Sequence, residues 1–329
     1  MCRGSQVNGK GGYGLSYLLR DVQVGEEFAL FVLIKAADVR VAKNGNPFIA
    51  FSFQDTSATI EGMYWSATDD EVSRYQAGRV VFLRGEKDLY QGKQQVKIKQ
   101  LRLAEAGEPD DPNLYVEHIG IKRSEIESEI NESIFLIKEP NIIRVVHKIL
   151  KMVADDFYVF PAAKRHHHAM AGGLSFHTVS MLRIARSLLK IYPDLNASLL
   201  ISGIILHDIG KTIELSGAIS TEYTLKGKLM GHLVLMSEFI DRACAEIGIN
   251  PEMESIILLK HVVLAHHGKL EFGSPVMPQI LEAELVHQID LMDANINMML
   301  TAVNKIEGGE YSEPVYPLER RQFYKPKFK

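Results

Sequence analysis

Residues 199–211 read LLISGIILHDIGK, an apolar run that ends in a histidine, an aspartate and a lysine. The apolar part is typical of a helix packed deep in a hydrophobic core, with Asn196 as its N-cap. His207 and Asp208 follow directly, and Lys211 comes one turn later. Because burying an unpaired charge costs several kcal/mol, buried charges are usually paired or bound to a metal ion. The pattern therefore indicates either a hydrogen-bonded His–Asp pair at the helix end or a metal site.

Histidines also occur on the predicted helices around this run. His177 lies beside the apolar face of the preceding helix, and His232 lies inside an apolar stripe over residues 225–243. The next helix ends in AHHG, with His266 and His267. A single histidine on an apolar face is usually a hydrogen-bonded core residue. Several imidazoles in one core are hard to satisfy without an ion, so together they favour a metal site.

Carboxylates accompany these imidazoles. The final long predicted helix, residues 277–299, contains Asp290 and Asp293. Imidazole and carboxylate without a thiolate suit Mn, Fe, Co, Ni or Zn rather than Ca or Mg alone. A single carboxylate can bridge two ions, an arrangement that enzymes use to cleave phosphoesters. Lys211 could then contact a phosphate oxygen as a mobile point charge.

The chain before residue 105 has a different pattern. Residues 26–104 contain runs that alternate apolar and polar residues in the manner of β-strands. Turn signals separate the runs, including Asn44-Gly45. Three strands, a short helix over residues 68–76 and two further strands are the order of an OB-type barrel. We therefore expect a small β-barrel here, followed by an all-helical domain.

The barrel has features of a single-strand binding domain. Residues 28–104 contain 11 Lys and Arg against 8 Asp and Glu. Barrels of this type bind single-stranded nucleic acid with basic grooves and aromatic stacking platforms. The alternative is that the aromatic side chains belong to the core and that the lysines are solvated. The candidate contacts are Arg40, Lys43, Phe48, Tyr64, Tyr90, Lys97 and Lys99.

These patterns predict five parts of the chain. Residues 1–25 are Gly-rich and polar and are expected to be flexible, and residues 26–104 form the barrel. An acidic linker with two prolines spans residues 105–113. Residues 114–305 form the helical domain. A basic, aromatic tail, residues 306–329, could contact nucleic acid or a neighbouring subunit, or remain a loose solvated end.

Overall composition narrows the class of protein. The net charge is −4, so charge alone does not indicate a nucleic-acid binder. Only two cysteines occur, Cys2 and Cys244, which argues against a disulfide framework and suits a reducing cytosol. Neither a signal peptide nor an apolar run long enough to span a bilayer is visible. We therefore expect a cytoplasmic protein that does not enter a membrane.

The helical half resembles the HD phosphohydrolase superfamily, which is all-helical and uses metal-bound water on phosphoesters. The likeness rests on His177, His207-Asp208 with the string DIGK, and Asp290, and His232 in GHL and His266-His267 in AHHG resemble its two-metal members. With an OB-type domain in front, and the strings PAAKRHHH and GGLSFHT, the whole chain resembles the YhaM-type 3′–5′ exoribonucleases.

The resemblance implies a role for each matching residue. The implied metal ligands are His177, His207, Asp208 and Asp290 at the first ion, and His232, His266 and His267 at a second ion that Asp208 also binds. Asp208 and Lys211 would be the catalytic residues, with Lys211 on the scissile phosphate. Asp293 is a reserve candidate one turn after Asp290. For His166, His167 and His168 the string matches, but no ligand role follows.

The implied activity is that of a metal-dependent 3′–5′ exoribonuclease. It would hydrolyse phosphodiester bonds of single-stranded RNA with two divalent ions, manganese first among them, and release nucleoside 5′-monophosphates. Single-stranded DNA stays open as a second substrate, and homo-oligomers are an open expectation. Two alternatives are an HD hydrolase of free or cyclic nucleotides and a non-catalytic nucleic-acid-binding factor with a structural metal.

Overall fold

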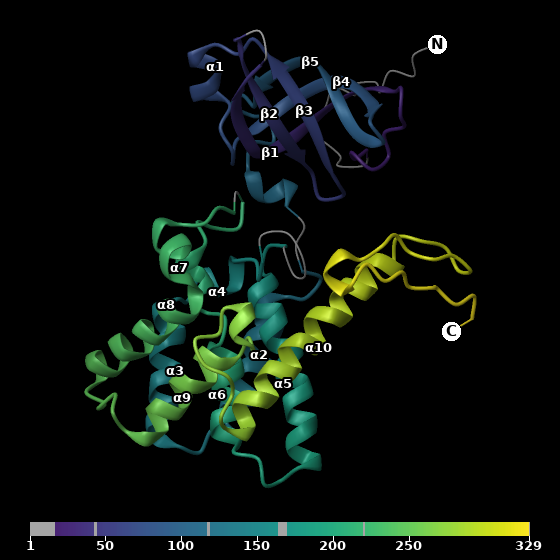
Figure 1. Cartoon of the computed structure of the whole chain (residues 1–329). Helices are drawn as coiled ribbons and strands as arrows, with labels where there is room; N and C mark the ends of the chain where they lie inside the picture. Colours follow the sequence, from purple (N-terminus) through teal and green to yellow (C-terminus); the bar gives the residue numbers. More distant parts are fainter. Residues whose placement is uncertain (1–16, 43–44, 117–118, 164–169, 220, 329) are drawn as a thin grey trace. The chain divides into compact units, whose positions relative to one another are not determined.

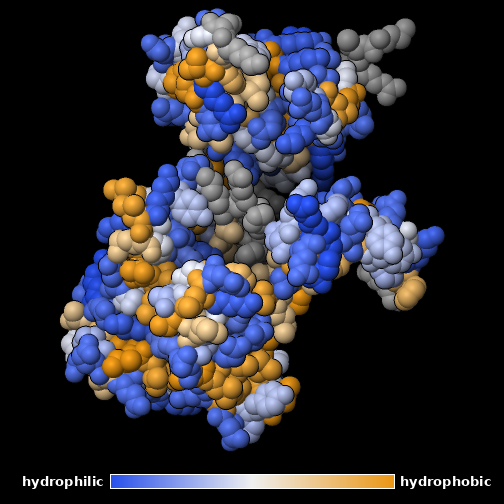
Figure 2. Space-filling view, viewed as in Figure 1, coloured by the Kyte–Doolittle hydropathy of each residue, from blue (hydrophilic) through white to orange (hydrophobic). Residues whose placement is uncertain are grey.

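The structure is a computed structural model that describes residues 17–42, 45–116, 119–163, 170–219 and 221–328. It divides into two compact units, Met1–Glu117 and His118–Lys329, which are described separately below. On the face seen in Figure 2, both units mix hydrophilic and hydrophobic residues, which is the usual composition of a protein surface.

The first unit is a closed five-stranded barrel with the strand order β1-β2-β3-β5-β4 (Figure 1). Its strands are β1 (Glu27–Val41), β2 (Pro47–Gln54), β3 (Thr59–Trp65), β4 (Val80–Tyr90) and β5 (Lys93–Leu103), with α1 (Asp69–Arg74) after β3 and the 3₁₀ helix η1 (Pro112–Tyr115) after β5. Thr68 caps α1 in a reciprocal capping box with Glu71. The order and the helix between β3 and β4 confirm the predicted OB-type barrel.

A segment before β1 packs onto the barrel. Leu19 and Val22 are buried in the barrel core, although residues 17–25 were expected to be flexible. Asp55 accepts a hydrogen bond from the Leu19 amide at 2.6 Å. The ammonium group of buried Lys87 donates to the Leu19 carbonyl at 3.3 Å and to the Val22 carbonyl at 2.9 Å. These contacts satisfy two buried charged side chains while they hold the segment in place.

The segment after β5 also packs onto the barrel. Arg102 donates two hydrogen bonds of 2.7 Å to the carboxylate of Glu108, and buried Tyr115 donates to the Pro109 carbonyl. The Gln54 side-chain amide donates to the Tyr115 carbonyl at 3.2 Å. Residues 105–113, expected as a linker, therefore lie within the first unit, and the division between units falls after them.

The second unit is helical, as the sequence predicts. Its helices are α2 (Arg123–Ile134), α3 (Pro140–Met152), α4 (Asp156–Val159), α5 (Gly173–Ile191), α6 (Ala197–Leu206), α7 (Lys211–Glu214), α8 (Leu225–Ile247), α9 (Glu254–Ala265) and α10 (Leu281–Val303), with the 3₁₀ helices η2 (Leu270–Phe272) and η3 (Tyr316–Leu318). Among the residues described, no helix is both long and apolar enough to cross a membrane.

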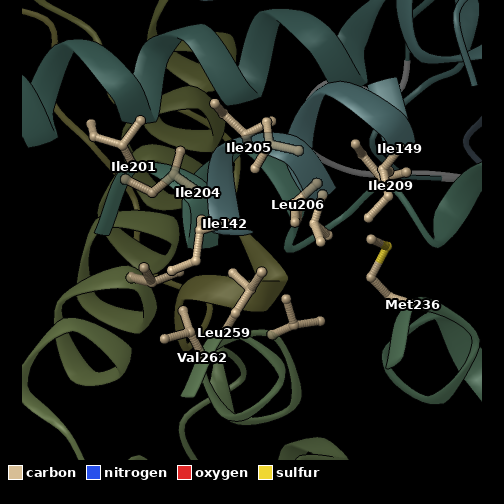
Figure 3. Close-up of a cluster of buried hydrophobic side chains, with 14 of the residues drawn as sticks. Ile142, Ile149, Ile201, Ile204, Ile205, Leu206, Ile209, Met236, Leu259 and Val262 are labelled. Carbon is tan, nitrogen blue, oxygen red and sulfur yellow. The ribbon is translucent and has the colours of Figure 1, made fainter. Parts of the chain in front are cut away.

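Helix α6 lies at the centre of this unit. The Asn196 side chain caps it by accepting from the Leu199 amide, as predicted, and residues 198–206 are all buried. The helix packs against α3, α5, α9 and α10. Figure 3 shows its side chains meeting those of α3, α8 and α9, including Ile204, Ile142 and Val262. Burial on all sides explains why this run lacks the amphipathic pattern of its neighbours.

One prediction for this unit was wrong. The sequence predicted a continuous buried stripe over residues 225–243, but Leu225 and Leu229 are each 76% exposed. The chain kinks at Gly231, where φ is +73° and ψ is 158°. This backbone conformation breaks the helical repeat, so positions before Gly231 face a different way from positions after it. His232 is buried directly after the kink.

The C-terminal residues after α10 are more ordered than a loose end. Isolated β-bridges pair Tyr311 with Tyr324 and Val315 with Arg321. Leu318 is buried between them in η3. The tail therefore folds back on itself with one short 3₁₀ helix and no α-helix among its described residues, in agreement with its prolines.

Substitution of Gly203 tests the packing of α6. A Cβ atom at this position would lie 2.4 Å from Cγ1 of Val262. We expect Gly203→Ala to lower the free energy of unfolding of the helical unit by about 1–3 kcal/mol, because overpacked cores force neighbours to shift. Chemical denaturation followed by circular dichroism measures the change. Adding Val262→Ala should recover part of the loss, and a Gly203→Ala variant as stable as wild type would contradict the close contact.

Candidate metal centre

Most of the predicted ligands meet in the interior of the second unit. His207 is the residue that ends α6, and Asp208 lies in the turn before α7. His177 comes from the first half of α5, His232 from the kink in α8 and Asp290 from α10. His266 and His267 directly follow α9. Residues from five segments of the chain therefore supply one site.

The Asp208 carboxylate lies at the centre of the cluster. Its Oδ2 accepts a hydrogen bond from Lys211 Nζ at 2.6 Å and lies 3.3 Å from His207 Nε2. Its Oδ1 lies 3.5 Å from His232 Nε2 and 3.8 Å from His266 Nε2. One carboxylate thus faces imidazoles on two sides, which is the placement that a bridging ligand requires.

The opposite side of the cluster is formed by His177. Its Nδ1 lies 2.7 Å from Asp293 Oδ2, and its Nε2 lies 3.1 Å from Asp290 Oδ1. The same Nε2 lies 3.3 Å from Nε2 of His207. Asp293, the reserve ligand candidate, therefore contacts the outer nitrogen of His177, whereas Asp290 faces the inner one. This geometry favours Asp290 as the ligand and Asp293 as the residue that orients the ring.

Backbone carbonyls hold three further rings by Nδ1. His207 contacts the Ile204 carbonyl at 2.8 Å, His266 the Val263 carbonyl at 2.7 Å and His267 the Phe272 carbonyl at 2.9 Å. A carbonyl oxygen can only accept, so each Nδ1 donates and Nε2 is the nitrogen left for a ligand role. Metal-binding histidines are usually held in this way, with the second nitrogen donating to an oxygen. The rings are thus oriented as ligands.

Two residues that were not predicted as site residues support the cluster. Glu214, at the end of α7, accepts from the Nδ1 of His232 at 3.2 Å. His287 of α10 contacts the His266 carbonyl through Nδ1 at 2.9 Å. The ring of His287 lies so close to Gly268 that a Cβ there would meet His287 Nε2 at 2.3 Å. A glutamate seven residues after a histidine has no distinctive spacing, so the sequence offers no signal for Glu214.

Two buried polar atoms of the site lack a hydrogen-bond partner within the described parts of the chain: Asp208 Oδ1 and His232 Nε2. Buried polar atoms are rarely left unpaired, so they need a ligand. Three sets of donor atoms, each set within 4.8 Å, could hold an ion: His232, His266 and His267; His177, His207 and Asp208; and His207, His266 and Asp290. Nitrogen and carboxylate donors suit a first-row transition metal. These residues therefore fit divalent ions.

The cluster keeps its charges despite burial. Burial opposes the charged form of His177, but its hydrogen bonds with Asp290 and Asp293 raise the pKa to about 9. Burial likewise opposes ionisation of Asp208, but the charge of Lys211 and the neighbouring imidazoles hold its pKa well below the usual range. The pKa of Lys211 is raised by Asp208 against the effect of burial. Asp208 and Lys211 are therefore both ionised at neutral pH.

Two further imidazoles, those of His266 and His267, are neutral. Burial lowers the pKa of His266 well below its ordinary value, and burial also lowers the pKa of His267. A neutral imidazole is the form that binds metal ions. His266 and His267 are therefore ready to act as ligands without losing a proton at neutral pH.

The barrel carries a separate candidate surface for nucleic acid. Arg40 of β1 pairs with Phe48 of β2, which pairs with Trp65 of β3. Directly paired residues point to the same face of a sheet, so these three side chains form a row across three strands. The rings of Phe48 and Trp65 lie 4.6 Å apart, and Trp65 is 62% exposed. Sequence reasoning did not assign Trp65 to the site, because strand alternation alone did not fix its orientation.

Other predicted contacts lie elsewhere. Tyr64 pairs with buried Ile49, and its hydroxyl donates to Glu71, which together with burial raises the tyrosine pKa to about 12. Tyr64 therefore lies on the opposite face of β3 from Trp65. Tyr90 is exposed at the β4–β5 turn.

The two predicted lysines of β5 are paired with carboxylates. Lys97 Nζ lies 3.0 Å from Asp88, and Lys99 forms ion pairs with Glu27 and Glu86. The predictions for Lys43, His166, His167 and His168 concern residues outside the described parts of the chain.

Several known proteins are similar to this chain. A family model described as the HD domain matches residues 174–295. The chain is 44% identical to the 3′–5′ exoribonuclease YhaM of Listeria monocytogenes over 94% of this chain and 98% of that protein. It is 42% identical to the 3′–5′ exoribonuclease YhaM of a Geobacillus species over 93% of this chain and 94% of that protein. The solved second OB-fold domain of replication protein A from Methanococcus maripaludis matches 28% of this chain and 96% of its own, with 12% identity and a TM-score of 0.23.

Divalent ions should stabilise the helical unit through this cluster. At a free Mn²⁺ concentration 100 times the dissociation constant, binding to one site adds about 2.7 kcal/mol to the free energy of unfolding. We expect the thermal midpoint to rise with Mn²⁺ and to fall again with EDTA, as measured by differential scanning calorimetry. Asp208→Asn should lose most of this response. An equal response in that variant would contradict the central role of Asp208.

Proposed function

The chain belongs to the family of YhaM 3′–5′ exoribonucleases, and from this premise we propose that it removes nucleotides from the 3′ end of single-stranded RNA by metal-dependent hydrolysis. The products would be nucleoside 5′-monophosphates. The observation that carries the proposal is the convergence of imidazole nitrogens and Asp290 on the Asp208 carboxylate. We also propose a cytoplasmic location, and self-association stays a prediction from the sequence.

Two divalent ions are proposed for the site, with manganese as the first candidate. The residues that would hold one ion are His177, His207, Asp208 and Asp290, and those that would hold the other are Asp208, His232, His266 and His267. When bound, such ions lower the pKa of water and neutralise charge on phosphate oxygens. The donor set supports this proposal because it offers more ligands than the four of a closed structural site.

Lys211 would stabilise the charge that develops on the phosphate. Its ammonium group is held by Asp208 Oδ2 at 2.6 Å, and its raised pKa keeps it cationic. A cation fixed in a buried site needs no reorganisation when negative charge develops near it. Asp208 would therefore both bind ions and keep Lys211 in position.

His177 and Asp293 would act together in the same site. Asp293 holds Nδ1 of His177, so the ring cannot turn away from Asp290 and His207. A ligand that is oriented before substrate binds keeps the reacting groups within a few tenths of an ångström of their productive positions. Asp293 would thus orient the ring of His177 and would not itself bind an ion.

The row formed by Arg40, Phe48 and Trp65 would hold the RNA strand. Bases stack on aromatic rings regardless of sequence, and an arginine beside the rings can contact the phosphate backbone. In OB folds, the face formed by strands 2 and 3 binds oligonucleotides, and Phe48 and Trp65 lie on these strands. This surface supports a polymeric substrate over a free or cyclic nucleotide, which would have no use for it.

Replacement of Asp208 tests the chemistry. Asp208→Asn keeps the size of the side chain but loses the charge that binds ions and holds Lys211. We expect the rate of 3′-end hydrolysis to fall by a factor of at least about 100, because a group that stabilises transition-state charge has effects of this size. A time course with 5′-labelled single-stranded RNA and Mn²⁺ measures the rate, and binding of the RNA should persist.

Assays with other substrates distinguish an exoribonuclease from a hydrolase of free or cyclic nucleotides. A 3′-phosphorylated RNA, free nucleotides and a cyclic dinucleotide should be poor substrates for wild type. Faster turnover of the nucleotides than of RNA would favour a nucleotide phosphohydrolase. Full activity of Asp208→Asn on RNA would refute the proposed site.

Replacement of Trp65 tests the RNA surface. Stacking of one base on an aromatic ring contributes about 1–3 kcal/mol, so Trp65→Ala should weaken RNA binding by a factor of about 5–150. Fluorescence anisotropy with a labelled oligonucleotide measures the affinity. Tyr192→Ala, which removes another exposed aromatic ring, is the matched control and should bind as wild type does. Unchanged binding by Trp65→Ala would remove this residue from the surface.

A further inference from the structure

We propose that Glu214 is a positioning residue that fixes the tautomer and orientation of His232, so that His232 Nε2 is presented to an ion shared with Asp208. The inference rests on the proposed metal-dependent function and deepens it. It assigns a role to a buried carboxylate that binds no ion itself. Among the described residues, Glu214 belongs to none of the sets of donor atoms that could hold an ion.

The backbone of Glu214 is fixed against the start of α8. The Thr224 amide donates to the Glu214 carbonyl at 2.9 Å, and the Thr224 hydroxyl donates to the Ile213 carbonyl at 2.9 Å. A Cβ atom at Gly227 would lie 2.2 Å from the Glu214 carbonyl oxygen, so only glycine permits this approach. The end of α7 and the first turn of α8 therefore form one tightly packed pair.

The backbone of His232 is held on two sides. A Cβ at Gly210 would lie 2.3 Å from the His232 carbonyl oxygen, so the chain before α7 touches His232 directly. On the other side, the kink at Gly231 turns the His232 amide toward Glu214 Oε1, to which it donates at 3.2 Å. Only a residue with positive φ allows this turn, which explains a glycine directly before a ligand.

The side chain of Glu214 also holds the imidazole. Oε1 accepts from His232 Nδ1 at 3.2 Å, and Oε2 lies 3.2 Å from the same nitrogen. An ionised carboxylate can only accept, so Nδ1 is the protonated nitrogen. His232 Nε2 is the nitrogen left for a ligand: it is buried, lies 3.5 Å from Asp208 Oδ1 and has no hydrogen-bond partner among the described residues. Carboxylate–histidine pairs of this kind orient metal ligands and strengthen them.

Three variants test the role of Glu214. Glu214→Ala removes both acceptors, Glu214→Gln keeps one acceptor oxygen at similar size, and Glu238→Ala removes an exposed carboxylate from α8 as the matched control. Far-UV circular dichroism and thermal unfolding of the metal-free proteins establish that each is folded. Should Glu214→Ala fail to fold, Glu214→Leu, which also removes both acceptor oxygens, takes its place in both measurements.

The first measurement is the tautomer of His232 in the metal-free protein. Long-range ¹H–¹⁵N spectra of protein labelled at histidine distinguish the two nitrogens, and loss of a signal in His232→Asn assigns the residue. We expect only Nδ1-protonated His232 in wild type, Glu214→Gln and Glu238→Ala. In Glu214→Ala both tautomers should appear. A single Nδ1-protonated form in Glu214→Ala would overturn the inference.

The second measurement is titration with Mn²⁺ alone by isothermal calorimetry. Loss of a residue that orients a metal ligand typically weakens metal binding by 10- to 100-fold. Glu214→Ala should show this loss for one class of site, Glu214→Gln a smaller loss, and Glu238→Ala none. Equal Mn²⁺ affinity in Glu214→Ala and wild type would also overturn the inference. Neither measurement uses RNA, so failure of wild type to degrade RNA would count against the proposed function and leave this inference to be judged separately.

Discussion

The ion pair between Asp208 and Lys211 is the contact on which the helical unit depends. It places two opposite charges in a buried site, and each stabilises the charged form of the other. Removal of either partner leaves an uncompensated buried charge, which is far more costly than the pair itself. The apolar helix α6, in which residues 198–206 are all buried, brings Asp208 to this place. The turn after α6 thus contributes both to the packing of the unit and to the charges of the site.

Much of this arrangement could be predicted from the sequence. The apolar run ending in His207 and Asp208, with histidines on the surrounding helices, predicted the helical core and its cluster of ligands. The strand order and intervening helix predicted the barrel, because five short strands with that helix leave few topologies. The segments beside the barrel were less predictable. Residues 17–25 were grouped with the Gly-rich, polar N-terminal stretch, but Leu19, Val22 and buried Lys87 tie them to the barrel through contacts distant in sequence.

The residues whose roles could not be predicted from the sequence were missed for a common physical reason. Glu214 and His287 act through acceptor and donor geometry at positions that only the folded chain brings near the imidazoles. The prediction of a continuous buried stripe over residues 225–243 was wrong because it assumed an unbroken helix. The positive φ of Gly231 changes the direction in which the side chains after it point. Trp65 and Tyr64 are neighbours in sequence with opposite orientations, and only the pairing of β3 with β2 shows which of them faces outward.

The anchoring of the imidazole rings by oxygen acceptors has a consequence for how the centre would fill. All five rings have Nδ1 on an oxygen of the same helical unit: three on backbone carbonyls, His232 on Glu214 and His177 on Asp293. The metal site is then already assembled before a cation binds, and binding restricts few further side-chain rotations. Cations would then bind and dissociate reversibly without any folding step. The fraction of occupied sites would therefore follow the concentration of free cations.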